Sequence, residues 1–135
     1  MQTGISESLP IYQKVYIHMI NALLSFLACV AVGALVGGTG AYMVVSGDAT
    51  PLHSYHRSNV QPQDLAVLAR WSGLGAVMLG VGIILLSLPL LAKTRPLPGW
   101  ARGMLPVVLG GAFLIIGAVV ITGSIVYYNG AIVAP

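Results

Sequence analysis

The residues best suited to chemistry gather in one polar segment, 47–63, and just after it. His53 and His56 stand three positions apart, a spacing that places both imidazoles on one face of a helix. Two imidazoles could bind a metal ion or a haem iron, with Asp48 or Asp64 as a third ligand. Histidine also titrates near neutral pH, so the pair could sense pH. The candidate loop site comprises His53, Tyr55, His56, Arg57, Asp64 and Arg70.

A polar loop without a metal is the simpler interpretation of this segment. Two loop histidines are more often solvated or hydrogen-bonded near lipid headgroups than metal-bound, so we expect no metal ion and no cofactor. A ligand, metal or haem site built on His53, His56 and Asp64 stays open as the alternative. The run Ser54-Tyr55-His56 with a distant acid is no catalytic triad, and no HExxH, GxSxG, P-loop or GxGxxG pattern occurs. We therefore do not expect an enzyme.

Three long apolar stretches, about 17–46, 71–92 and 103–128, contain no Asp, Glu, Lys or Arg. Charged residues make up 7% of the chain, whereas a soluble domain carries about 25%. The hydrocarbon core of a bilayer is about 30 Å thick, and roughly 20 helical residues cross it. Backbone groups in lipid must bond within their own helix. The sequence therefore predicts an all-α integral membrane bundle of three transmembrane helices, forming one domain in a lipid bilayer.

Polar segments divide the chain around these spans. The expected parts are an N-terminal arm (1–16), a first span (17–46), a polar loop (47–63), an entry turn with the second span (64–92), a basic loop (93–102), a third span (103–128) and a tail (129–135). Pro62 suits the first position of a helix and Asp64 its first turn, so the second helix should begin near Pro62. Its amphipathic entry turn predicts a short interfacial segment. Pro96 and Pro98 predict no helix in the basic loop.

Glycine recurs along all three spans at spacings that keep small residues on one helix face. Gly33 and Gly37 form a GxxxG pattern, which lets helix backbones approach closely. Other glycines repeat at the seven-residue spacing of left-handed packing. The expected helix-packing positions are Gly33, Gly37, Gly73, Gly80, Gly110 and Gly117. These positions indicate transmembrane helix partners, from this chain or another; the alternative is that glycine is simply common in membrane helices.

The distribution of positive charge predicts the topology. Three basic residues lie in the basic loop and Lys14 precedes the first span, whereas the polar loop holds Arg57 and Arg70. Lysine and arginine collect on the cytoplasmic side. We therefore expect a multi-pass protein with a cytoplasmic N-terminus and its C-terminus outside. The basic residues are too scattered for a nucleic-acid surface, so no nucleic-acid partner is expected.

The loop and the start of the second span resemble a group of small bacterial membrane proteins with one span, a short polar loop and two further glycine-rich spans. The similar segments are Leu52-His-Ser-Tyr-His56-Arg-Ser-Asn-Val60-Gln-Pro-Gln-Asp64 and Ala69-Arg-Trp-Ser-Gly73-Leu-Gly75. The hydropathy layout is also similar to that of small relatives of the SdpI-type bacteriocin immunity proteins, although the loop motif of that group is absent here. The resemblance implies the bacterial plasma membrane and no particular reaction.

These patterns together favour a non-enzymatic helix-packing or interaction protein, such as a small subunit, an immunity-type protector or an envelope-stress factor. An oligomeric small-molecule transporter is a weaker alternative. Coupled carriers place an ionisable group inside a span, and the three stretches carry no acid, lysine or arginine. His18 lies at the far end of the first span, roughly 40 Å from the loop histidines at about 1.5 Å per residue.

Overall fold

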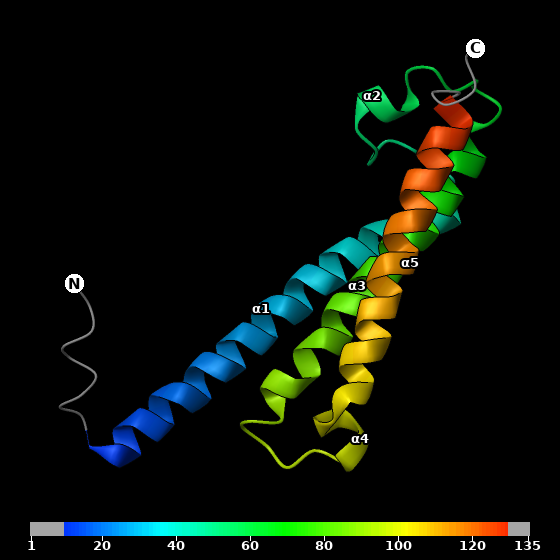
Figure 1. Ribbon diagram of the computed structural model, residues 1–135. Coiled ribbons are helices and arrows are strands. Elements are labelled where there is room, and N and C mark those ends of the chain that lie inside the picture. Colours follow the sequence, from blue (N-terminus) through cyan, green and yellow to red (C-terminus); the bar gives the residue numbers. More distant parts are fainter. Residues whose placement is uncertain (1–9, 130–135) are drawn as a thin grey trace, which may run out of the picture.

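The computed structural model describes residues 10–129, apart from the side chain of Tyr55, and this part of the chain is helical without strands (Figure 1). Three long helices dominate, and two single helical turns lie in the loops. They are α1 (Ile11–Ser46), α2 (Ser54–Arg57), α3 (Leu65–Leu91), α4 (Gly99–Arg102) and α5 (Met104–Asn129). Within the described residues α1, α3 and α5 are long and apolar enough to cross a membrane. The prediction of an all-α bundle of three transmembrane helices is confirmed.

The first helix is longer than the span expected from the apolar stretch. It has 36 residues and begins at Ile11, directly after Pro10, so the last residues of the expected arm continue the helix. The rest of that arm, 1–9, and the tail residues 130–135 lie outside the described part of the chain. The helix ends at Gly47, whose φ of 67° is left-handed and whose N–H donates to the Met43 carbonyl at 2.9 Å. Glycine suits this helix end because it has no Cβ to clash there.

Two expectations about helix ends are wrong. The second long helix begins at Leu65 rather than near Pro62, because a turn comes first: the Asp64 N–H donates to the Gln61 carbonyl at 2.9 Å. The basic loop was expected to contain no helix, yet Gly99–Arg102 forms one turn after Pro98. Proline is excluded from a helix interior but is compatible with the position just before the first turn.

Helix α3 is the central element, because it packs against α5 on one side and against the C-terminal half of α1 on the other, while α1 separates from α3 toward its N-terminus (Figure 1). On the α1 side, glycines of the two helices face each other at backbone distance. A Cβ at Gly33 would lie 2.8 Å from the Gly80 carbonyl oxygen, and a Cβ at Gly40 would lie 2.5 Å from that of Gly73. Gly37 adds a looser approach, 3.7 Å from the Gly80 Cα. Only glycine leaves room for helices this close.

A second set of glycines joins α3 to α5. A Cβ at Gly75 would lie 2.7 Å from the Gly117 carbonyl oxygen, and a Cβ at Gly82 would lie 2.9 Å from that of Gly110. The two sets on α3 are offset by two positions, about 200° at 3.6 residues per turn. They therefore occupy opposite faces of α3, which explains how one helix packs closely against two neighbours.

The polar loop covers a small apolar core of its own at the end of the bundle where α1 finishes and α3 begins. Met43, Ala49 and Ala69 are buried together, and Leu52 and Leu65 pack against them. Leu68, in the first turns of α3, is also fully buried. These residues hold the loop 47–64 against the helices. We call this segment the polar cap.

Candidate functional site

Asp48 organises the start of the polar cap. Its Oδ1 accepts hydrogen bonds from the backbone N–H of Thr50 at 2.8 Å and from the Thr50 hydroxyl. Its Oδ2 accepts a hydrogen bond from the Tyr42 hydroxyl at 2.9 Å. The Asp48 N–H in turn donates to Ser46 Oγ at 3.1 Å. This short network joins the last turn of α1 to the first residues of the cap, so the cap leaves the helix in a defined direction.

The same contacts favour the ionised form of Asp48. The hydrogen bonds from Thr50, followed by the bond from Tyr42 and the positive charge of Arg57, lower the pKa of this carboxyl below its ordinary value. Hydrogen bonds donated to a carboxylate stabilise the charged form. Asp48 is therefore a structural anion at neutral pH rather than a proton donor.

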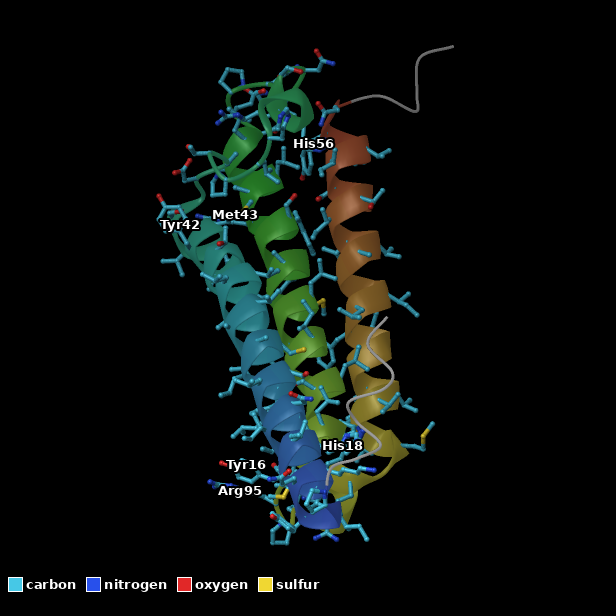
Figure 2. The ribbon with its side chains drawn as sticks, turned by 90° about the vertical axis from the view of Figure 1, so that its left-hand side faces the viewer. Tyr16, His18, Tyr42, Met43, His56 and Arg95 are labelled. Carbon is cyan, nitrogen blue, oxygen red and sulfur yellow. The ribbon has the colours of Figure 1, made fainter. Side chains whose placement is uncertain are left out.

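The two histidines of the candidate site come together as the three-residue spacing predicts. His53 precedes α2 and is exposed, His56 lies within it and is half-buried, and their ring centroids are 6.3 Å apart at an interplanar angle of 70°. The His56 carbonyl accepts a hydrogen bond from Asn129 Nδ2 at the end of α5, which also donates to the Ile125 carbonyl at 2.9 Å. This hydrogen bond connects the cap to α5. Figure 2 labels His56 at the cap end of the bundle.

A groove of about 490 Å³ opens beside this contact. Its polar lining comes from His56, Asn59, Thr122 and Asn129, and its apolar lining comes from α5. The Oδ1 atom of Asn129 is buried there and has no hydrogen-bond partner. A buried carbonyl oxygen costs free energy unless it is hydrogen-bonded. Asn129 therefore lines the groove and also carries an unsatisfied acceptor, which is itself buried.

The remaining predicted site residues are not drawn into one centre. Arg57 lies in α2, where its charge acts on Asp48, and Asp64 stands at the N-cap of α3. Arg70 is exposed, and a Cβ on Gly47 would lie 3.8 Å from its Nε. The side chain of Tyr55 lies outside the described part of the structure. Within residues 10–129 no group of three or more His, Cys, Asp and Glu side chains could hold a metal ion.

Sequence reasoning missed three residues that shape the cap. Tyr42 and Thr50 bond to Asp48, and Asn129 anchors α2. An Asp two positions before a Thr, directly after a glycine helix end, is a recognised turn signal that could have indicated the Thr50 contact. Nothing in the sequence pairs Asn129 with His56, because a contact over that separation leaves no local pattern.

Comparison with known proteins adds no relative: no family model, no curated protein and no solved structure matches this chain.

Proposed function

We propose that this chain is a small, non-enzymatic protein of the bacterial plasma membrane that binds a transmembrane helix through the open face of α1. The open face is the side of α1 that faces away from α3, and all of its residues are exposed. Its members are Leu24, Ala28, Ala31, Leu35, Gly38, Tyr42 and Val45. The observation that carries the proposal is that this face repeats the heptad spacing of the packed side and yet meets no other helix among the described residues; at its end Tyr42 donates a hydrogen bond to Asp48.

The open face has the shape that helix pairing in lipid requires. Lipid tails are as apolar as leucine, so an apolar surface alone gives no drive toward a partner helix. Small residues favour helix pairing, because they let two backbones approach closely and make van der Waals contact. Along this face the small residues Ala31 and Gly38 alternate with the large side chains of Leu35 and Tyr42. A Cβ on Gly38 would meet no atom within 4 Å.

The packed side of α1 shows how this chain uses the same spacing. Gly33 and Gly40, seven positions apart, bring α1 against α3 at backbone distance. Ala31 and Gly38 repeat that separation on the other side of the helix. Because this spacing of small residues forms one close-packed interface, we expect it to form a second one on the open face, with another copy of this chain or with a helix of another protein.

The charge distribution supports an orientation for the complex. Lys14, Lys93, Arg95 and Arg102 lie at the end of the bundle opposite the polar cap. Basic residues favour the cytoplasmic side. In this proposal the N-terminus is cytoplasmic and the cap faces outward; the resemblance to small bacterial membrane proteins implies the plasma membrane as the location. A protector or subunit of this kind acts by binding and needs no catalytic group.

The size of the complex in lipid nanodiscs or mild detergent tests the proposal. We expect the wild-type protein to elute with its partner, either a second copy or another protein. Gly38→Leu should release the monomer, because a large side chain blocks close approach on the open face. The matched control is Gly111→Leu on α5, another helical position where a Cβ meets no atom within 4 Å. A wild-type monomer, or equal effects of both substitutions, contradicts the proposal.

One observation favours a second candidate function, ligand binding at the polar cap. A groove beside the cap is lined by the polar side chains of His56, Asn59, Thr122 and Asn129, and Asn129 also carries a buried oxygen without a hydrogen-bond partner. Elemental analysis and visible absorbance of the purified protein detect a metal or haem, and mass spectrometry under native conditions detects a small organic ligand. A bound species that is lost in His56→Ala supports this function, and a protein without any bound species excludes it.

A further inference from the structure

Two hollows flank the N-terminal turns of α1 where the basic loop meets them. One has a volume of about 500 Å³ and is lined by Val15, His18, Met19, Asn21, Ala22, Ser25, Leu90 and Lys93. The other, about 230 Å³, is lined by Tyr16, Met19, Ile20, Leu23, Thr94 and Arg95. Met19 borders both. Figure 2 shows Tyr16 and Arg95 on one side of this end of α1 and His18 on the other.

Each hollow carries one positive side chain from the basic loop. Lys93 lines the larger hollow and Arg95 the smaller, and both are exposed. The acids within residues 10–129, Asp48 and Asp64, belong to the polar cap at the other end of the bundle. No described carboxylate therefore neutralises the two cations, and the hollows attract anions.

The depth of the hollows is that of lipid headgroups. The uncharged run between Arg70 and Lys93 spans about 33 Å at about 1.5 Å per residue, close to the roughly 30 Å of hydrocarbon in a bilayer. The register that pairs Gly33 with Gly80 brings Lys93 to the level of Ile20.

Exposed aromatic side chains mark the same depth. Tyr12, Tyr16 and Trp100 are 70%, 65% and 60% exposed at this end of the bundle. Aromatic rings of this kind prefer the membrane–water boundary. Register, span length and aromatic positions therefore agree on where the boundary lies.

The lining of the smaller hollow is amphipathic along the membrane normal. In this hollow Tyr16, Thr94 and Arg95 supply polar groups, whereas Ile20 and Leu23 continue toward the bilayer centre. The larger hollow mixes the two kinds of side chain along its length: Lys93, His18, Asn21 and Ser25 are polar, and Val15, Ala22 and Leu90 are apolar. A free anion would use only the polar part of such a surface, whereas a phospholipid matches both parts.

We infer that the Lys93 hollow and the Arg95 hollow each bind the phosphate of an anionic phospholipid, with its acyl chain along α1. Lys93 and Arg95 donate charge-assisted hydrogen bonds to phosphate oxygens from either side of Met19. Basic pockets beside transmembrane helices on the cytoplasmic side recognise anionic headgroups in this manner. The two cations lie beyond the N-terminal end of the open face, which begins at Leu24, so phosphate binding does not depend on whether α1 also binds a partner helix.

Mass spectrometry of the full chain released from nanodiscs tests the site. The nanodiscs contain equal amounts of phosphatidylglycerol and phosphatidylcholine, so that charge is the only headgroup preference measured. We expect the protein to retain phosphatidylglycerol preferentially, and Lys93→Gln with Arg95→Gln to lower that retention by about five-fold for each cation. Lys93→Arg with Arg95→Lys keeps both charges and should keep the lipid.

The control removes the same charge from the same end of the bundle. Lys14→Gln with Arg102→Gln changes two cations that line neither hollow. We expect this variant to retain phosphatidylglycerol as the wild type does. Equal loss in the control variant, equal retention of both lipids, or full retention after the Lys93 and Arg95 substitutions overturns the site. Displacement of the lipid by excess inorganic phosphate, which then stays bound alone, overturns the lipid as the source of the phosphate.

Discussion

Gly75 on α3 and Gly117 on α5 face each other so closely that a Cβ on either would lie 2.7 Å from the carbonyl oxygen of the other. The obstacle in each case is backbone, which cannot rotate away as a side chain can. Across the central helix, Gly33 and Gly80 repeat this relationship with α1. The bundle therefore depends on a few glycines more than on large buried side chains.

Gly117→Ala should destabilise the bundle by about 1–3 kcal/mol, the usual cost of overpacking a close contact. The added methyl group must push α5 away from the Gly75 carbonyl. Thermal unfolding in one detergent measures the change. The control is Gly111→Ala on the same helix, where a Cβ meets no atom within 4 Å and helix propensity improves. If the two variants have the same melting temperature, the close packing of α3 and α5 is wrong.

Ser72 and Ser124 should be energetically coupled. Their hydroxyls share a buried hydrogen bond of 2.9 Å between α3 and α5, and Ser124 also donates to the Ile121 carbonyl at 2.9 Å. Such bonds between membrane helices contribute about 0.6 kcal/mol on average. A double-mutant cycle of Ser72→Ala and Ser124→Ala, followed by unfolding, measures the coupling energy. Strictly additive effects of the two substitutions would show that the bond does not contribute to stability.

Acid should loosen the polar cap through Asp48. Hydrogen bonds from Thr50 and then Tyr42, together with the charge of Arg57, lower the pKa of this carboxyl in the folded protein. Because the pKa of Asp48 is lower in the folded protein, ionised Asp48 stabilises the cap fully above its unfolded pKa of about 3.9. This stabilisation is lost as the pH falls through the folded pKa. Protection of the Thr50 amide, corrected for intrinsic exchange rates, should therefore decrease over that acidic range.

The Asp48→Asn variant separates this effect from general acid unfolding. Asparagine has no titrating group but keeps an oxygen that can accept the Thr50 N–H, so protection of its Thr50 amide should change little on acidification. An unchanged pH profile in Asp48→Asn would mean that another group loosens the cap.

The sequence predicted the helices well because the solvent leaves few alternatives. A run without charges that is long enough to cross lipid must be helical, and α1, α3 and α5 follow the three apolar stretches. The exact residues at which the helices begin were harder to predict. The start of α3 at Leu65 depends on a turn closed by Gln61, and the helical turn after Pro98 depends on local backbone geometry rather than on hydropathy.

Most contacts between distant segments could not be predicted from the sequence. Seven-residue glycine spacing indicated which helix faces pack closely, but it did not say that Gly75 meets Gly117 while Gly73 meets Gly40. Spacing gives the face of each helix, whereas pairing depends on how the loops place the helices. The hydrogen bond from Asn129 to the His56 carbonyl and the hollows beside α1 are similar cases, because each joins residues far apart in the chain.

Site-specific photo-crosslinking in native membranes tests the proposed helix-binding face of α1 most directly. A photoreactive amino acid at position 38 reports on the open face, and one at position 111 reports on α5, where a Cβ also meets no atom within 4 Å. The account predicts a discrete protein adduct from position 38, identified by mass spectrometry as a second copy or one partner, and lipid adducts alone from position 111. Lipid adducts alone from position 38, or the same protein adduct from both positions, would contradict it.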